Sequence, residues 1–174
     1  MPKWTLRLDK APTQTSPFTS LKTTHRPVYD TARSRALPTN PSAPAFTEVM
    51  LYNSCNELTE GTTTSLYFYR GGRWVTPPVG VPAGKFTASA LAEAEEGHPE
   101  RDEGEDRIPF AGRWGHSVRS AKVGSGGQRG TTRRWALAMG MCMEEPVSVD
   151  TVKVGETVWV SNGVRGFGCG IVVE

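Results

Sequence analysis

The segment Asn56–Pro78, NELTEGTTTSLYFYRGGRWVTPP, contains the clearest secondary-structure signal in the sequence. Two runs rich in β-branched and aromatic residues, Ser65–Arg70 and Arg73–Thr76, flank the pair Gly71-Gly72. Paired glycines between such runs are typical of a β-hairpin with a two-residue turn. The beginning of the segment is less ordinary, because Glu60 lies between a threonine and a glycine just before a hydrophobic strand. This carboxylate is either solvated in a turn or held by a partner.

The flanking sequence extends the hairpin into a larger unit. Alternation of polar and apolar residues predicts a short strand over 4–9 and a half-buried strand over 46–53. Helical spacing over 28–33, with Thr24 as a candidate N-cap, predicts a helix between them. Residues 147–173 predict one or two more strands, punctuated by glycine. This order of elements favours a mixed α/β (α+β) domain.

The composition limits the functional classes. A chain of 174 residues is long enough for one domain with a hydrophobic core, and 19 glycines with 13 prolines predict many loops. No apolar run is long enough to span a membrane, and the N-terminus lacks the apolar stretch of a secretory signal. The three cysteines show no CxxC spacing. We therefore expect no metal site, no disulfide framework and a cytoplasmic location.

Charge is distributed unevenly along the chain. Residues 92–106 contain eight acidic residues and one basic residue, which leaves ten acidic and nineteen basic residues elsewhere. We interpret residues 79–123, which include this acidic run, as a solvated insertion. A basic body favours an anionic partner such as nucleic acid, phosphate or a small carboxylate. The aromatic residues of the hairpin alternate toward a core rather than forming a stacking surface, which disfavours nucleic acid.

A glycine-rich stretch, GSGGQRGTT over 124–132, precedes a second expected helix. The N-terminus of such a helix presents free N–H groups that suit a phosphate, with Gly130, Thr131 and Thr132 at its border. The stretch is no nucleotide P-loop, since no lysine precedes the threonine pair, and Arg129 breaks a GxGxxG pattern. The alternative is a hinge before an ordinary helix capped by Thr131 or Thr132. The apolar content of that helix would come from Trp135, Leu137, Met139 and Met141.

Two further residues suggest a cofactor. Lys22 lies among threonines, a histidine and a proline, and a lysine whose pKa is lowered by burial forms Schiff bases. An ordinary surface lysine is the alternative. Glu60, if buried, could pair with a protonated heterocyclic nitrogen. An amine, a carboxylate and a phosphate-binding loop are the three groups that pyridoxal 5′-phosphate requires.

Five sequence blocks carry a family resemblance. They occur in the family's order: Lys22–Asp30, Glu48–Gly61, Arg73–Pro78, Gly130–Arg133 and Val158–Gly166. The chain resembles the class IV pyridoxal-phosphate enzymes, which include branched-chain and D-amino-acid aminotransferases and aminodeoxychorismate lyase. The KTTHR and SNGVRG wording is most similar to fungal-type aminodeoxychorismate lyases. The resemblance implies the large C-terminal domain of the D-amino-acid aminotransferase-like fold (fold type IV), a distorted β-barrel flanked by helices.

The resemblance implies roles for individual residues. Lys22 would be the catalytic residue, binding the cofactor covalently and shuttling protons, while Glu60 would bind its pyridine nitrogen. Arg26 would be the basic residue beside the lysine, and Tyr29 would flank the cofactor ring, unless it is only a packed helix aromatic. The phosphate would be bound by Gly130, Thr131 and Thr132, and a second phosphate or substrate wall would be formed by Ser161, Asn162 and Gly163.

The same resemblance implies the domain organisation and the activity. Residues 1–78 and 124–174 would form the two parts of the cofactor-binding domain, interrupted by the insertion at 79–123. The reaction would convert 4-amino-4-deoxychorismate to 4-aminobenzoate and pyruvate. A class IV aminotransferase and an inactive remnant serving as an interaction module are the alternatives. The partners would be a small anionic amino or carboxylate substrate and a second copy in a homodimer, with neither nucleic acid nor membrane. Relatives carry a small domain before the lysine, so we expect this chain to correspond to the C-terminal domain alone.

Overall fold

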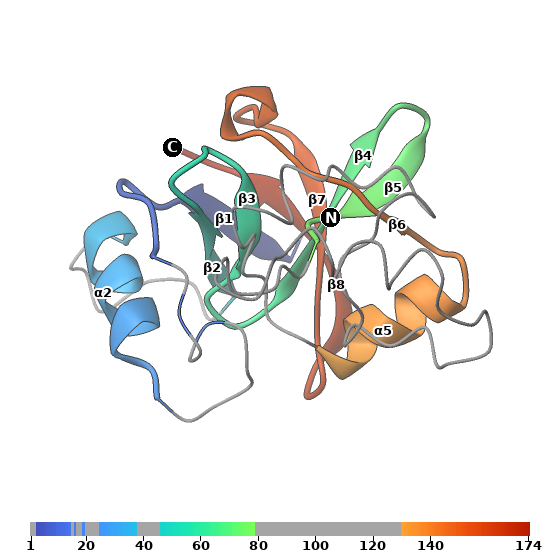
Figure 1. Cartoon of the computed structure of the whole chain (residues 1–174), viewed down its shortest axis with the longest axis horizontal. Coiled ribbons are helices and arrows are strands. Elements are labelled where there is room, and N and C mark those ends of the chain that lie inside the picture. Colours follow the sequence, from blue (N-terminus) through green and yellow to red (C-terminus); the bar gives the residue numbers. More distant parts are fainter. Residues whose placement is uncertain (1–2, 15, 17–18, 20–24, 38–45, 79–129) are drawn as a thin grey trace, which may run out of the picture.

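The computed structural model describes residues 3–14, 16, 19, 25–37, 46–78 and 130–174. In these ranges eight strands form one curled sheet with two α-helices outside it (Figure 1). The strands are β1 (Trp4–Leu8), β2 (Thr47–Tyr52), β3 (Leu58–Gly61), β4 (Ser65–Arg70), β5 (Arg73–Thr76), β6 (Met143–Glu144), β7 (Thr157–Asn162) and β8 (Gly166–Val172). The helices are α2 (Pro27–Ala36), α5 (Thr131–Ala138) and the short 3-10 helix η2 (Val149–Thr151).

The sheet curls until its two edges approach each other. The strand order is β3-β2-β1-β8-β7-β4-β5-β6, with β1 parallel to both of its neighbours. At the edges, the Leu58 N–H donates to the Val147 carbonyl (2.8 Å) and the Val149 N–H donates to the Asn56 carbonyl (2.9 Å). These bonds connect β3 to the segment that follows β6. The distorted barrel flanked by helices, expected from the family resemblance, is confirmed.

The interior of this barrel is the main hydrophobic core. Alternate residues of each strand point inward, as Leu66 and Phe68 do in β4, while Ser65 and Tyr67 point outward. The buried members of the core come from all the long strands and from the segment after β6: Trp4, Leu6, Met50, Leu58, Leu66, Phe68, Val75, Val147, Val158, Val160 and Val172.

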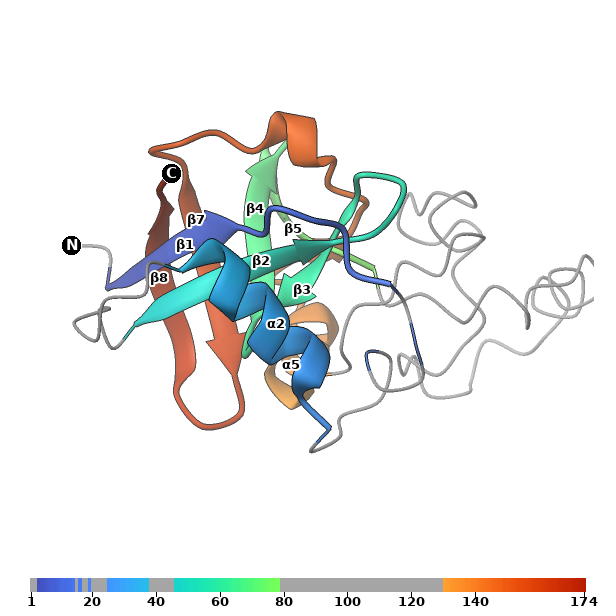
Figure 2. The same cartoon turned by 90° about the vertical axis from the view of Figure 1, so that its left-hand side faces the viewer.

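The two helices cover separate parts of the outer surface of the barrel (Figure 2). Helix α2 packs Tyr29, Ala32 and Ala36 against the outward residues Val49 and Leu51 of β2. Strand β2 is therefore buried on both faces, and the expectation of a half-buried strand was wrong because α2 covers its second face. Helix α5 packs on the other side of the barrel, where its Ala136 lies against Tyr67 of β4 and Cys142.

Local sequence signals were accurate for the hairpin. Strands β4 and β5 have the predicted bounds, and Gly71 and Gly72 adopt φ angles of +55° and +81°. Two successive positive φ angles give the turn type that joins twisted strands. The aromatic residues of the hairpin do not all face the core, however, because Tyr69 is 54% exposed on the outer surface.

The helix starts differ from the sequence expectation. The N-cap of α2 is Arg26, and Thr24 lies outside the described residues. The N-cap of α5 is Gly130 rather than either threonine, with no side-chain cap. Helix α5 buries Arg133 and Ala136, while Trp135 is half exposed. Residues 79–123, expected to be an insertion, also lie outside the described part of the chain. No helix among the described residues is long and apolar enough to cross a membrane.

Candidate active site

A β-bulge determines where Glu60 points. Across the β2–β3 ladder, Leu51 pairs with Glu60, but the next residue of β2, Tyr52, pairs with Leu58. Thr59 is therefore an extra residue on β3. Directly paired residues share a face of the sheet, so Leu58 points into the barrel whereas Glu60 lies on the outer face with Leu51. Without this bulge, Leu58 and Glu60 would point to the same face.

Glu60 is a buried carboxylate held by α2. Its side chain is only 4% exposed, which excludes the solvated turn glutamate that the sequence left open. The hydroxyl of Tyr29 donates a hydrogen bond of 2.8 Å to Glu60 Oε1. Burial, and then the neighbouring Glu60 carboxylate, raise the pKa of Tyr29 well above its ordinary value. The tyrosine therefore remains a neutral donor.

Arg26 lies at the start of the same helix. Its NH2 group donates to the Thr62 carbonyl (2.9 Å), and its guanidinium lies over the Tyr29 ring, 5.0 Å from the ring centroid. The structure therefore brings together three of the expected site residues, Arg26, Tyr29 and Glu60, where α2 meets the end of β3.

A second group of expected site residues surrounds the N-terminus of α5. Ser161 Oγ donates to Thr132 Oγ1 (3.0 Å) and lies 2.8 Å from the Tyr67 hydroxyl. Gly130 lies so close to β4 that a Cβ atom there would be 3.1 Å from Ser65 Oγ. Buried hydroxyls from β4 and β7 thus adjoin a helix start whose first N–H groups have no side-chain cap. In Figure 1 the connection from β3 to β4 runs between α2 and α5.

Comparison with known proteins supports the family. The sequence profile of the amino-transferase class IV family matches residues 2–103. The chain belongs to the class IV aminotransferase family. Members of this family are enzymes that depend on pyridoxal phosphate. No curated protein matches the chain.

Solved structures share the fold of this class IV domain. One is a protein from Mesorhizobium loti assigned as an amino-acid aminotransferase, with 24% identity, a TM-score of 0.59, and coverage of 98% of this chain and 59% of that protein. Another is 4-amino-4-deoxychorismate lyase from Pseudomonas aeruginosa, with 14% identity, a TM-score of 0.56, and coverage of 99% of this chain and 48% of that protein. A third is the branched-chain amino acid aminotransferase of Thermobaculum terrenum in its pyridoxal-phosphate form, with 10% identity, a TM-score of 0.54, and coverage of 96% of this chain and 42% of that protein. The chain thus spans about half the length of these structures.

Two further expected site residues, Asn162 and Gly163, belong to the described part of the chain but lie away from α2 and the N-terminus of α5 in sequence. Asn162 and Gly163 lie at the turn between β7 and β8, where Asn162 Oδ1 accepts hydrogen bonds from the N–H groups of Val164 (3.1 Å) and Arg165 (2.8 Å). Lys22 lies outside the described residues. The roles expected for these three residues, and for the other site residues, stay predictions.

The sequence did not reveal the buried ion pair that anchors α5. Arg133, in the GTTR block, is 2% exposed, and it bonds to Glu144 of β6 and donates to the Pro77 carbonyl (2.9 Å). This pair ties α5 to β6 and to the end of β5. The only sequence signal was an arginine one position after the threonine pair, in a helix whose apolar residues suggested a different buried face.

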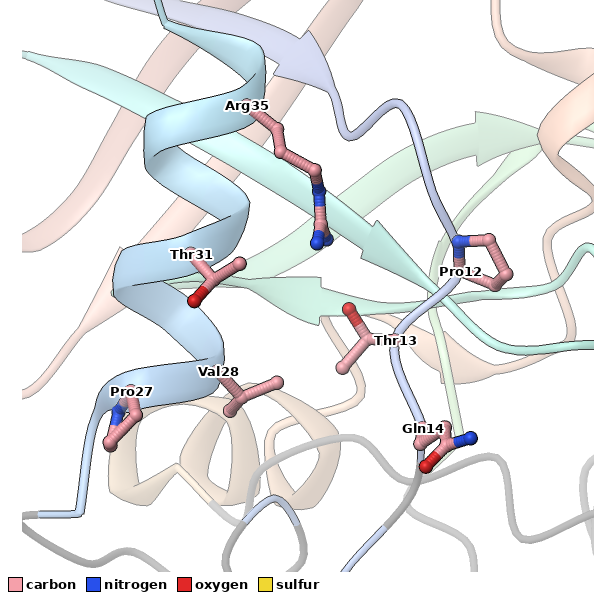
Figure 3. A pocket seen from close by; sticks show the side chains of 7 residues that line it. All are labelled: Pro12, Thr13, Gln14, Pro27, Val28, Thr31 and Arg35. Atoms are coloured by element: carbon pink, nitrogen blue, oxygen red, sulfur yellow. The ribbon is translucent and has the colours of Figure 1, made fainter.

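A pocket also adjoins α2, at residues other than those that contact Glu60. Figure 3 shows its lining residues, which are Pro27, Val28, Thr31 and Arg35 of the helix and the segment Pro12–Gln14 that follows β1. Arg35 forms a bidentate ion pair with Asp9, with N–O distances of 3.1 and 2.5 Å. None of the described residues that we expect to bind the cofactor lines this pocket, and we assign it no role in the chemistry.

Proposed function

We propose that this chain binds pyridoxal 5′-phosphate on the outer face of the barrel, between α2 and α5, and acts as a lyase of the aminodeoxychorismate lyase type. The observation that carries the proposal is the buried Glu60 carboxylate, turned outward by the bulge and held by a neutral tyrosine. A carboxylate held in this position can accept a hydrogen bond from a protonated pyridine nitrogen and balance its charge.

The donor set around the two helices fits this cofactor. Glu60 would hold the proton of the pyridine nitrogen, and Tyr29 would keep the carboxylate in place. The free N–H groups at Thr131 and Thr132 suit a phosphate, and the helix dipole adds to that attraction. Ser161 would support this end through its hydrogen bond to Thr132.

The chemistry divides between the cofactor and the protein. When bound, the cofactor would supply the electron sink that the reaction needs. The amine of Lys22 would move a proton between the substrate and its leaving fragment, and the protein would exclude water from the buried carboxylate. With 4-amino-4-deoxychorismate as substrate, the products would be 4-aminobenzoate and pyruvate. Arg26 would add positive charge for an anionic substrate.

A class IV aminotransferase is the second candidate, because two of the structures described above are aminotransferases. The same lysine would move protons in both reactions, so it does not distinguish them. The lyase proposal includes two further expectations from the family resemblance, namely a fungal-type enzyme and a homodimer.

The test begins with cofactor binding by the full chain. We expect absorbance of bound pyridoxal phosphate, and borohydride reduction followed by peptide mapping should place the label on Lys22. The Lys22→Ala variant should lose the label, whereas Lys153→Ala, a control at an exposed lysine, should keep it. A label scattered over surface lysines would contradict the proposal and favour an inactive remnant.

Product analysis then separates the two activities. A lyase forms pyruvate and 4-aminobenzoate in equal amounts without an amino acceptor. An aminotransferase requires a 2-oxo acid and forms the corresponding amino acid. Formation of amino acid alone would contradict the lyase proposal.

A further inference from the structure

Glu48 of β2 is a completely buried carboxylate that the proposed chemistry does not use. Its Oε1 accepts hydrogen bonds from the Val49 N–H (2.8 Å) and the Thr62 hydroxyl (2.5 Å). Its Oε2 accepts from the Thr63 N–H (3.1 Å), the Thr63 hydroxyl (2.6 Å) and the Thr64 hydroxyl (2.8 Å). Arg33 NH1 lies 3.7 Å from Oε1. The side chain is therefore surrounded by donors and by one cation.

The environment of Glu48 is that of a hydrogen-bond acceptor. A carboxylate is an acceptor with two oxygens, and five donors point at these two atoms. An anion buried in this way is tolerated only when hydrogen bonds and a nearby charge replace water. The run of three threonines that follows Gly61 supplies four of those donors, namely three hydroxyls and the Thr63 N–H. We call Glu48 with Thr62, Thr63 and Thr64 the threonine cage.

The threonine cage adjoins Glu60 directly. Gly61 alone separates Glu60 from Thr62, and a Cβ atom at Gly61 would lie 2.8 Å from Glu48 Cδ and 2.6 Å from Thr64 Oγ1. Only glycine therefore allows the chain to pass so close to the cage. The Gly61 N–H also donates to the Thr64 carbonyl (2.8 Å), which closes the turn.

Helix α2 and its N-cap also form hydrogen bonds to this turn. Arg33 NH1 donates to Thr62 Oγ1 (2.9 Å), and Arg26 NH2 donates to the Thr62 carbonyl (2.9 Å). Between them on the helix, Tyr29 donates to Glu60. Thr62 thus connects the Glu48 carboxylate to the helix that orients Glu60.

We propose that Glu48 is a positioning residue for the cofactor site. Its buried carboxylate fixes the turn over 62–64 through hydrogen bonds, and this turn holds Glu60 and Tyr29 in the arrangement that would bind the pyridine nitrogen. The expected change in cofactor binding rests on the proposed function, whereas the expected change in hydrogen exchange at the turn does not.

The test compares two buried glutamates in the full chain. Glu48→Gln keeps the size of the side chain but replaces one acceptor oxygen with a donor. Glu57→Gln is the matched control, because Glu57 is also buried but lies just before β3, beyond the bulge. We expect Glu48→Gln to weaken the binding of pyridoxal phosphate by about tenfold, the effect of losing one charge-assisted hydrogen bond, and Glu57→Gln to change it by less than about twofold.

A second pair of variants covers the case in which Glu48→Gln fails to fold. Thr63 is exposed, so Thr63→Val removes one hydroxyl donor without disturbing the core, and Thr63→Ser retains it. Thr63→Val should weaken cofactor binding, whereas Thr63→Ser should bind the cofactor as the wild type does. Equal affinities for the wild type, Glu48→Gln and Thr63→Val would overturn the inference.

Hydrogen exchange of the cofactor-free chain separates this inference from the proposed function. The amide of Gly61 should exchange at least about tenfold faster in Glu48→Gln, with the amides of β1 unchanged. If the wild type binds no cofactor but the Gly61 amide exchanges faster in Glu48→Gln, the proposed function fails and the positioning of the turn stands. If the wild type binds the cofactor but the amide and the affinity are both unaffected, the positioning role is wrong.

Discussion

Glu60 shows how the tertiary structure resolves one residue in an unusual sequence context. In the sequence it could be a solvated turn residue or a buried partner of a cofactor. In the structure it is buried, it lies on the outer face of the barrel, and it accepts a hydrogen bond from Tyr29. A carboxylate held on that face can pair with a protonated heterocyclic nitrogen, which is the role that we propose for it.

Removal of the Tyr29 hydroxyl should destabilise the chain. Tyr29→Phe takes one donor away from the buried Glu60 carboxylate, which costs about 1–3 kcal/mol of unfolding free energy. Urea denaturation at neutral pH would measure this loss. Tyr69→Phe is the control, since the exposed ring of Tyr69 should allow the change with almost no loss.

The effect of Tyr29→Phe should depend on pH. Because the pKa of Tyr29 is raised in the folded state, its contribution to stability is complete below the pKa of an unfolded tyrosine, about 10. It decreases as the pH rises above that value, because only the unfolded chain ionises there. The stability difference between wild type and Tyr29→Phe should therefore shrink above pH about 10. A difference that grows with pH would contradict the assignment of a neutral tyrosine.

At the scale of elements, the buried pair of Arg133 and Glu144 should hold α5 in place. Arg133→Met removes the cation from a buried carboxylate, which typically costs about 3–5 kcal/mol. Chemical denaturation would test this, with the exposed neighbour Arg134→Met as control. Adding Glu144→Gln to Arg133→Met should cost less than the sum of the two single changes, because the charge pair is removed as a unit.

The contact between β1 and β8 depends on a glycine. A Cβ atom at Gly170 would lie 2.3 Å from Leu6 Cδ1 and 2.8 Å from Trp4 Cβ, inside the barrel. Gly170→Ala should therefore lower the unfolding free energy by about 1–3 kcal/mol or more through overpacking. Gly72→Ala separates this clash from backbone strain, since Gly72 has φ +81° but no atom within 4 Å of a Cβ. A smaller loss for Gly170→Ala than for Gly72→Ala would show that the core can adapt.

For the whole molecule, the barrel predicts a gradient of local stability. Strand β1 lies between β2 and β8 near the centre of the sheet, and Leu6 is completely buried. Helix α5 buries only Arg133 and Ala136. Native-state hydrogen exchange should therefore show the slowest amides in β1 and β8 and faster exchange in α5. Exchange of α5 at the rate of β1 would mean that the helix and the barrel unfold as one unit.

The sequence predicted the parts of the fold that depend on local chemistry. The hairpin bounds followed from two glycines and two β-rich runs. The second helix start followed from a glycine-rich stretch, although its cap is Gly130. The threonine cage was missed, and its signal was the unexplained run of three threonines after Glu60 and Gly61. A hydroxyl run cannot by itself indicate which buried carboxylate it binds, since Glu48 lies 14 residues before Thr62.

The sequence by itself determined the family and the hairpin, because these depend on short motifs in a fixed order, and the same motifs predict the residues of a pyridoxal-phosphate site. Only the tertiary structure decided which way Glu60 points and what surrounds it. That direction depends on one extra residue in β3 relative to β2, and the surroundings depend on α2 covering the outer face. Register and burial are relations between segments far apart in the chain, and the free energy that fixes them arises only when those segments pack together.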